Sequence, residues 1–179
     1  MYISRVTLNE KDTYAQHQAL WGLFPNLPER KRDYLFRIEE EQGNQCVALL
    51  QSASKPVSCV GARVVQSKSF TAQLKNGDYF RFKLVANPTR KDSRSRKIIE
   101  LDNEGEQISW LQRKLTGANI TVTSMSSRLV KSQKCFTARF VTFEGVLQVT
   151  DSEKIYRALV MGIGRKKHAG AGLLSLASS

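Results

Sequence analysis

The chain has 179 residues, of which 41% are hydrophobic and 25% are charged, so it can fold as one large domain or two small ones. Lys and Arg outnumber Asp and Glu by 28 to 16, which gives a formal net charge of +12. This composition disfavours disorder over most of the chain, and the charge excess favours a polyanionic partner: above all a nucleic acid, with an anionic membrane face as the weaker alternative.

Several functional classes are disfavoured by what the sequence lacks. The first residues have no signal-peptide apolar core, and no run approaches the ~18 apolar residues of a membrane span. We therefore expect a soluble, cytoplasmic protein with no membrane partner. Cys46, Cys59 and Cys135 form no CxxC pair, and the acids lack metal-ligand spacing. No Walker-type phosphate loop or nucleophile elbow is present. We expect neither a metal nor a cofactor.

The first half of the chain predicts elements in the order β-α-β-β. Residues 2–8 are rich in β-formers and predict a strand. Asn9 is the expected N-cap of the following helix, with Asp12 in the place of a capping-box acid. Pro25 is expected to end this helix after Phe24. Further strands are predicted over residues 33–40, 45–51, 59–66 and 69–74.

The second half predicts a complete β-α-β-β-α-β unit. Asn76-Gly77 is a hairpin signal, and residues 79–86 alternate apolar and polar side chains before a basic loop that runs to Lys97. The remaining elements are a helix over 104–115, a strand over 120–124, strand structure over 136–149 folded back near Glu144-Gly145, a helix capped by Asp151 that ends at Met161, and a strand over 173–176.

These patterns predict an α+β fold with two tandem ferredoxin-like (RRM-like) β-α-β-β-α-β domains. Residues 1–76 would form the N-terminal domain and residues 77–179 the C-terminal domain. The second helix of the first domain is weak or missing from the pattern. The alternative is one such unit with irregular β additions.

Tyr14 and His17 are the strongest candidates for chemistry. Their spacing of three places them on nearly the same face of the first helix, with Trp21 four residues further on. A phenol beside an imidazole is a usable proton-transfer pair, because an ordinary histidine titrates near neutral pH. The alternative is a hydrogen-bonded helix histidine at a domain seam, with Tyr14 in a packing role. The pattern alone leaves both open.

The tail, residues 162–176, surrounds Arg165, Lys166 and Lys167 with glycines. Glycines let a backbone approach another molecule closely, and the cations suit a phosphate. Lys167 disfavours protonation of His168, so we do not expect His168 to be catalytic. It is expected to contact RNA by stacking or a hydrogen bond, and the alternative is an ordinary exposed loop residue. A basic turn before the last strand is the alternative.

Basic residues in several clusters predict a groove that follows phosphates. The predicted RNA-binding residues are Arg81, Lys83, Arg90, Lys91, Arg94, Arg96, Lys97, Arg128, Lys131, Lys134, Gly164, Arg165, Lys166, Lys167, His168 and Gly170.

Several of these segments resemble one known family over the whole chain. They include the opening MYISRVTL, the helix YAQHQALWGLFP, the stretches RDYLFRIE, FRFKLVANPTR and EQISWLQRKL, and the tail GIGRKKHAGAGLLSLA. HQxLWxLFP together with the glycine-rich tail is the most specific pair. The sequence resembles the CasE family, the CRISPR repeat-RNA endoribonucleases of Cascade complexes.

The resemblance implies a specific activity. Such a protein binds the repeat hairpin of precursor CRISPR RNA and cuts at the 3′ base of its stem without a metal. The upstream 2′-hydroxyl attacks the scissile phosphate and leaves a 2′,3′-cyclic phosphate and a 5′-hydroxyl. The implied partners are the precursor RNA, the mature guide RNA and other Cascade subunits, including the backbone subunit next to the hairpin. Target DNA would be met only through that complex.

The resemblance also implies residue roles. His17 falls on the catalytic histidine and Tyr14 on the assisting tyrosine, while Arg165 to Lys167 would contact RNA near the cut and Arg90 to Lys97 would lie beside the hairpin groove. The chain is shorter than is typical of the family on both sides of EQISWLQRKL, so the extent of the stem contact does not carry over. A non-catalytic RNA-hairpin-binding module is the alternative function.

Overall fold

The structure, a computed structural model, describes residues 1–133 and 136–178. Contacts divide the chain into two compact units. The first unit contains Met1–Thr71, Lys131–Phe136 and Lys167–Gly170. The second unit contains Ala72–Val130, Thr137–Lys166 and Ala171–Ser179.

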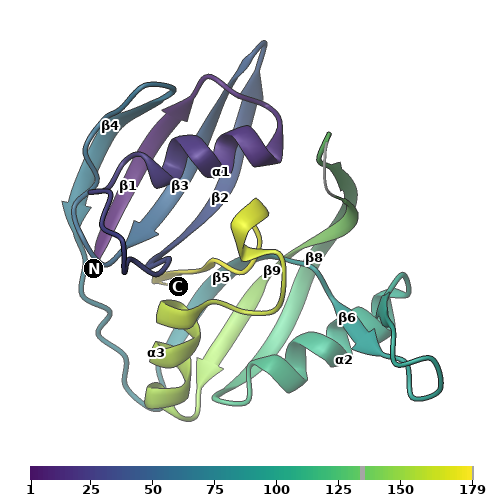
Figure 1. The fold of residues 1–179 in the computed structure, drawn as a ribbon. Coiled ribbons are helices and arrows are strands. Elements are labelled where there is room, and N and C mark those ends of the chain that lie inside the picture. Colours follow the sequence, from purple (N-terminus) through teal and green to yellow (C-terminus); the bar gives the residue numbers. More distant parts are fainter. Residues whose placement is uncertain (134–135, 179) are drawn as a thin grey trace. The chain divides into compact units, whose positions relative to one another are not determined.

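The first unit is a four-stranded antiparallel sheet with one helix, α1 (Thr13–Trp21), across one face (Figure 1). Its strands are β1 (Tyr2–Leu8), β2 (Tyr34–Gln42), β3 (Gln45–Ser52) and β4 (Ala62–Ser69), in the order β2-β3-β1-β4. This is the strand order of a ferredoxin-like unit. The connection from β3 to β4, residues 53–61, carries no helix.

The second unit repeats the same strand order with both helices present. Its elements are β5 (Tyr79–Ala86), α2 (Glu104–Lys114), β8 (Ala118–Lys131), β9 (Thr137–Val149), α3 (Ser152–Met161) and β10 (Leu174–Ser178), with sheet order β10-β5-β9-β8. A small hairpin, β6 (Thr89–Lys91) and β7 (Ile98–Glu100), is inserted before α2. The predicted α+β fold of two tandem ferredoxin-like domains is therefore confirmed.

Each sheet buries one face under its own helices. In the first unit, Leu20 and Leu23 pack against sheet residues such as Phe36 and Leu50. In the second unit, the side chains that pack together are Phe82, Leu84, Trp110, Leu111, Phe143, Ile155 and Leu159. Burying a side chain of this size contributes about 1.5–3 kcal/mol. The alternation predicted for residues 79–86 is confirmed, since Phe82, Leu84 and Ala86 are all buried.

Three expectations about the first half were wrong. Asp12, not Asn9, is the N-cap of α1, because its carboxylate accepts hydrogen bonds from the backbone N–H groups of Tyr14 at 3.0 Å and Ala15 at 3.3 Å. The helix ends at Trp21, before Pro25 could stop it. One strand, β4, replaces the two predicted over 59–66 and 69–74, and residues 70–75 are not in a strand.

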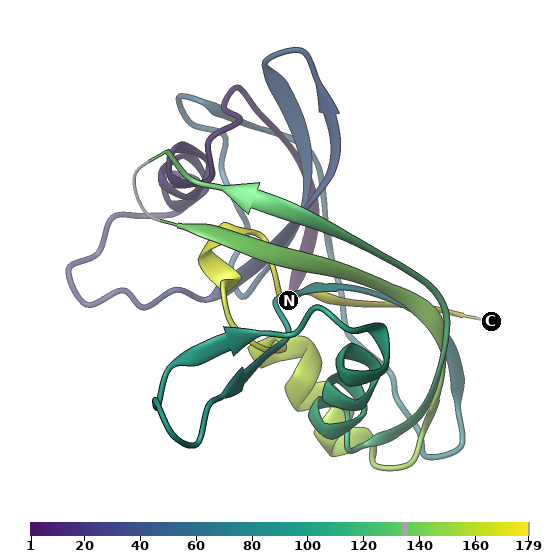
Figure 2. The ribbon, with the colours of Figure 1, turned by 90° about the vertical axis from the view of Figure 1, so that its right-hand side faces the viewer.

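The second half also departs from the prediction. Strand β9 is continuous and does not fold back at Gly145. A glycine is required at this position because a Cβ would collide with the backbone oxygen of Thr121 on the neighbouring strand. Strand β8 is much longer than predicted and runs beside β9 (Figure 2). The predicted basic loop contains the β6–β7 hairpin. Asn76-Gly77 forms a turn into β5, but no strand precedes it.

Candidate active site

The imidazole of His17 lies at the meeting point of three elements of the first unit. It projects from α1 and is half-buried. The hydroxyl of Tyr34, the first residue of β2, is 3.4 Å from its Nδ1. Its ring centroid is 6.1 Å from that of Trp21 and 6.3 Å from that of His168. His168 belongs to a short 3₁₀ helix, η1 (Lys167–Ala169).

Tyr34 is a buried, neutral phenol. Its side chain is stacked on Phe24 with ring centroids 5.5 Å apart, meets Trp21 edge-on, and only 3% of the residue is exposed. Burial raises the pKa of Tyr34 to about 12, because the phenolate is poorly solvated there. Tyr34 therefore offers His17 a hydroxyl rather than a charge.

The pKa of His17 is lowered from its ordinary value near 6.5. Burial is the larger cause, and the positive charge of Arg32 is the second. Both disfavour the imidazolium ion, so His17 is neutral at neutral pH. A neutral imidazole has one ring nitrogen free of a proton, which is what a general base requires.

Arg30 and Arg32, two residues apart, have different surroundings. The guanidinium of Arg30 lies over the rings of Trp21 at 4.7 Å and Phe24 at 4.4 Å, and its Nη2 is 2.9 Å from a carboxylate oxygen of Asp33. Its Nη1 also donates to the backbone oxygen of Trp21 at the end of α1. Arg30 thus stabilises the helix end, whereas Arg32 is exposed and acts on His17 through its charge.

The phenol that is hydrogen-bonded to His17 is therefore Tyr34, which the sequence reasoning missed. Tyr34 is 17 residues from His17, and an aromatic residue that opens a buried strand gives no sequence signal of a contact with that histidine. Tyr14 lies on α1 as predicted, is 43% exposed, and its hydroxyl accepts a hydrogen bond of 3.0 Å from Gln18 Nε2. Its assisting role stays a prediction.

The glycine-rich tail places some of its predicted RNA-binding residues near His17. Ala169 and Gly170 are buried, and Gly170 has a φ of +93° with its missing Cβ 3.2 Å from the ring of Phe36. This packing anchors η1, and the exposed ring of His168 meets Phe136 edge-on at 5.6 Å. Lys131 and Lys167 belong to the same unit.

The other predicted RNA-binding residues in the described part of the chain belong to the second unit. Arg81 and Lys83 line a hollow of about 360 Å³ on the β5 face, where Lys83 Nζ is 3.2 Å from a carboxylate oxygen of Glu144. Gly164 has a φ of +78° and lies against Trp110. Arg128 and Arg165 are exposed, and Lys166 is partly exposed. Lys134 lies outside the described residues.

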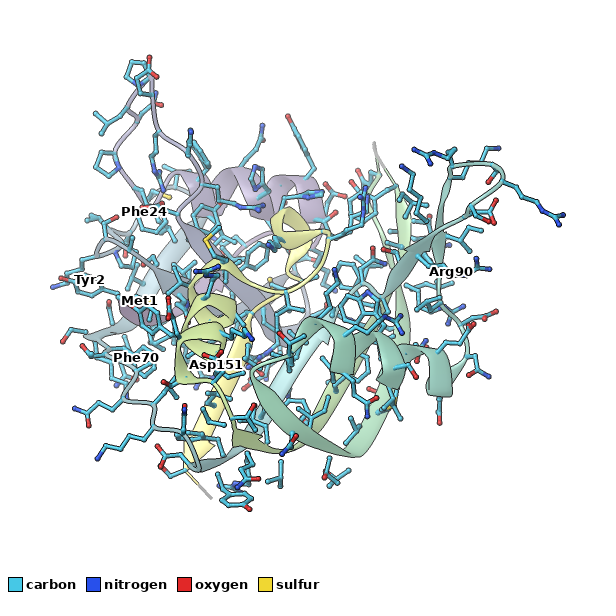
Figure 3. All side chains as sticks on the ribbon, turned by 90° about the horizontal axis from the view of Figure 1, so that it is seen from below. Met1, Tyr2, Phe24, Phe70, Arg90 and Asp151 are labelled. Carbon is cyan, nitrogen blue, oxygen red and sulfur yellow. The ribbon has the colours of Figure 1, made fainter. Side chains whose placement is uncertain are left out.

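The β6–β7 hairpin carries the densest of the predicted clusters. Arg90 and Lys91 lie on β6, and Arg94, Arg96 and Lys97 follow in the turn. Nitrogen-tipped side chains surround this hairpin (Figure 3). The Asp92 carboxylate accepts hydrogen bonds of 2.7 Å from the backbone N–H and the hydroxyl of Ser95, and Arg96 has a φ of 60°. The turn is therefore held by hydrogen bonds between the side chain of Asp92 and Ser95.

Within residues 1–133 and 136–178, no group of three or more His, Cys, Asp or Glu side chains is placed to hold a metal ion. In the same part of the chain, no helix has the length and apolar character needed to cross a membrane.

A family model described as "CRISPR associated protein" matches residues 1–178. The chain belongs to this family. The CRISPR system Cascade subunit CasE of Escherichia coli (strain K12) is 40% identical over 197 residues, covering 99% of both chains. The crystal structure of Cas6e from Escherichia coli K-12 superposes with a TM-score of 0.84 at 37% identity, covering 100% of both chains.

A second relative in the family is the CRISPR-associated endoribonuclease Cse3 of Thermus thermophilus. It is 28% identical over 210 residues, covering 99% of this chain and 100% of the relative. Its structure bound to an RNA that represents a pre-cleavage complex superposes with a TM-score of 0.83 at 27% identity, with 99% and 100% coverage. The family resemblance seen in the sequence is confirmed.

Proposed function

We propose that this chain is a metal-independent endoribonuclease that binds the repeat hairpin of precursor CRISPR RNA and cuts at the 3′ base of the stem. The relatives support this class, since one is named an endoribonuclease and another a Cascade subunit. The observation that carries the proposal is the neutral imidazole of His17, hydrogen-bonded to Tyr34 and influenced by the charge of Arg32.

His17 would act as the general base. Its unprotonated ring nitrogen takes the proton of the 2′-hydroxyl, the 2′ oxygen bonds to phosphorus, and the bond from phosphorus to the 5′ oxygen breaks. The products are a 2′,3′-cyclic phosphate and a 5′-hydroxyl. The attacking group is part of the substrate and already close to the phosphate, so no metal-bound hydroxide is needed as a nucleophile. A positioned base contributes about 10²–10⁴ in rate.

Two further residues would assist at the same place. Arg32, the cation whose charge reaches His17, would stabilise the extra negative charge on the phosphorane. Tyr14 projects from the same helix as His17 and is exposed to substrate, so it would position the 2′-hydroxyl.

RNA binding would use charge and shape. The grooves of A-form RNA give side chains little access to base edges, so phosphates and the helical shape are the main features to read. The exposed cations of the β6–β7 hairpin suit a duplex groove, and Arg165 to Lys167 suit the backbone near the cut. Affinity should fall steeply with salt, because each phosphate contact releases counterions.

The partners follow from the same assignment. The protein would hold the precursor RNA before the cut and the mature guide RNA after it. It would then remain as a Cascade subunit next to the backbone subunit at the hairpin, and meet target DNA only through that complex.

The test is a cleavage assay with a labelled repeat hairpin from the same genome, in EDTA. We expect one cut at the 3′ base of the stem, with a cyclic phosphate on the product. His17→Ala should abolish this cut while its affinity for a hairpin with a 2′-deoxy scissile position stays unchanged. Tight, salt-sensitive binding by the unmutated protein without any cut would favour the non-catalytic RNA-binding module. Cutting that needs added magnesium would contradict the proposed chemistry.

A further inference from the structure

The second histidine of the chain lies beside the first. His17 on α1 and His168 on η1 have ring centroids 6.3 Å apart, with their planes at 87°. The separation is about the length of two hydrogen bonds of roughly 3 Å each. Two imidazoles at this spacing can reach two different oxygens of one phosphate.

We propose that His168 is a second catalytic residue, the general acid that protonates the departing 5′ oxygen. This inference rests on the proposed ribonuclease function and adds to it. It also changes the role expected for His168 from the sequence, which was contact with RNA alone.

The position of His168 is fixed by its neighbours rather than by its own burial. Ala169 is 4% exposed, and Gly170 packs so closely on Phe36 of β2 that a Cβ there would be only 3.2 Å from the ring. On its other side, His168 meets the ring of Phe136 edge-on at 5.6 Å. The imidazole is therefore exposed to substrate while the backbone that carries it is anchored.

The chemistry of the cut calls for two groups. In an in-line displacement, the attacking 2′ oxygen and the departing 5′ oxygen lie on opposite sides of the phosphorus atom. His17 would take the proton of the 2′-hydroxyl as the new P–O bond forms. The imidazolium of His168 would give its proton to the 5′ oxygen as the old P–O bond breaks. His17 ends protonated and His168 neutral, and proton exchange with water restores both.

The other groups around His17 are poorer acids. The buried hydroxyl of Tyr34, with a pKa of about 12, gives up its proton reluctantly and is 3% exposed. Arg32 carries a guanidinium, which is not among the groups that usually act as general acids. An imidazolium titrates near neutral pH and is the usual general acid in enzymes. The phosphate anion of a bound RNA is a favourable hydrogen-bond partner for the imidazolium of His168.

A substrate with sulfur in place of the 5′ oxygen at the scissile bond tests the inference. A thiolate leaves without a proton, because a thiol has an ordinary pKa near 8.5. We expect His168→Ala to slow single-turnover cleavage of the oxygen substrate by about 10²-fold or more. The same variant should cleave the sulfur substrate at nearly the rate of the unmutated protein. His168→Gln keeps hydrogen bonding but transfers no proton, so it should also cleave the oxygen substrate slowly and the sulfur substrate at nearly the normal rate.

Two controls separate this role from others. His17→Ala should fail on both substrates, because the base is still needed. Arg165→Ala, which removes an exposed cation proposed to contact the RNA backbone, should slow both substrates by the same factor. If His168→Ala cuts both substrates normally, or slows both equally, His168 is not the general acid. The ribonuclease proposal itself would survive that result, and would fail only if the unmutated protein does not cut the oxygen substrate.

Discussion

Helices α1 and α3 cover different sheets of the same strand order, yet they are held by different forces. The buried side chains of α3 are Ile155 and Leu159, an apolar pair four residues apart. The buried side chains of α1 are Thr13, Gln16 and Leu20, of which two are polar. The helix that carries His17 therefore departs from the apolar stripe of an ordinary surface helix. Such departures are expected where residues are selected for function rather than for packing.

Helix α1 is positioned by directional bonds. The Nε2 group of Gln16 donates to the backbone oxygens of Glu10 at 3.1 Å and Lys11 at 3.2 Å. The carboxylate of Asp12 caps the helix and accepts a further hydrogen bond of 2.9 Å from the backbone N–H of Gln133. Hydrogen bonds fix direction better than apolar contact does, so this arrangement suits a helix that carries the proposed base, His17.

If α3 is held by apolar burial and α1 by hydrogen bonds, the largest loss of stability should come from shortening Leu159 on α3. This side chain is 2% exposed in the apolar core under α3, so Leu159→Ala should lower the free energy of unfolding by about 2–5 kcal/mol. Urea unfolding measures the loss. Below the unfolding transition, the rate of RNA cleavage should be unchanged, because no residue proposed for the chemistry lies on α3. A loss of activity in the folded variant would contradict the assignment of a purely structural role to α3 and of the proposed chemistry to α1.

Gln16 should give a smaller loss of stability but a clear loss of activity. Gln16→Ala removes two part-buried hydrogen bonds to backbone oxygens, each worth about 0.5–1.5 kcal/mol. The start of α1 should loosen, and cleavage should slow as His17 loses its aim. Gln18→Ala is the matched control for stability, since Gln18 is exposed and should change the free energy of unfolding by less than about 0.5 kcal/mol. Equal losses in the two variants would exclude the anchoring role of Gln16.

The same difference explains what the sequence could predict. The second unit follows ordinary rules, so the alternation of β5 and the capped helix α3 were predicted correctly. Gly145 was wrongly predicted to mark a turn. A glycine is required there because the backbone of Thr121, 24 residues away in the sequence, passes too close for a Cβ. In the first unit, Asn9 is the predicted N-cap and Asp12 the predicted capping-box acid, but both side chains can cap a helix, and the structure shows that Asp12 does so.

The candidate site shows the same limit. His17 could be found from one helix because a motif surrounds it. Tyr34 could not, because its contact with His17 depends on how β2 packs against α1. Arg30 and Arg32 are equivalent in the sequence, yet one lies over two aromatic rings and the other acts on His17. Side chains brought together by tertiary packing leave little local pattern to detect.

Tyr34 provides the finest test of how the first unit prepares His17. A base that works through Nε2 needs its proton on Nδ1, which must then donate to the oxygen of Tyr34. Tyr34→Phe keeps the stack on Phe24 but removes that acceptor, so we expect cleavage to slow by about 2- to 10-fold, the worth of one net hydrogen bond. Tyr156→Phe, which alters an exposed phenol on α3, should change nothing.

The pH profile gives the sign of the effect. The folded-state pKa of His17 lies below 6.5, so both its proposed activity as a base and its contribution to stability are expected above that pH and should be lost as the pH falls. A charged ring donates a stronger hydrogen bond than a neutral one, so loss of the acceptor costs the imidazolium more. In Tyr34→Phe, the pKa of His17 should therefore fall further, and the acid limb of the cleavage profile should move to lower pH. A limb that moves to higher pH would mean that the Tyr34 hydroxyl donates to Nδ1 instead, and that His17 presents a protonated Nε2 to the RNA.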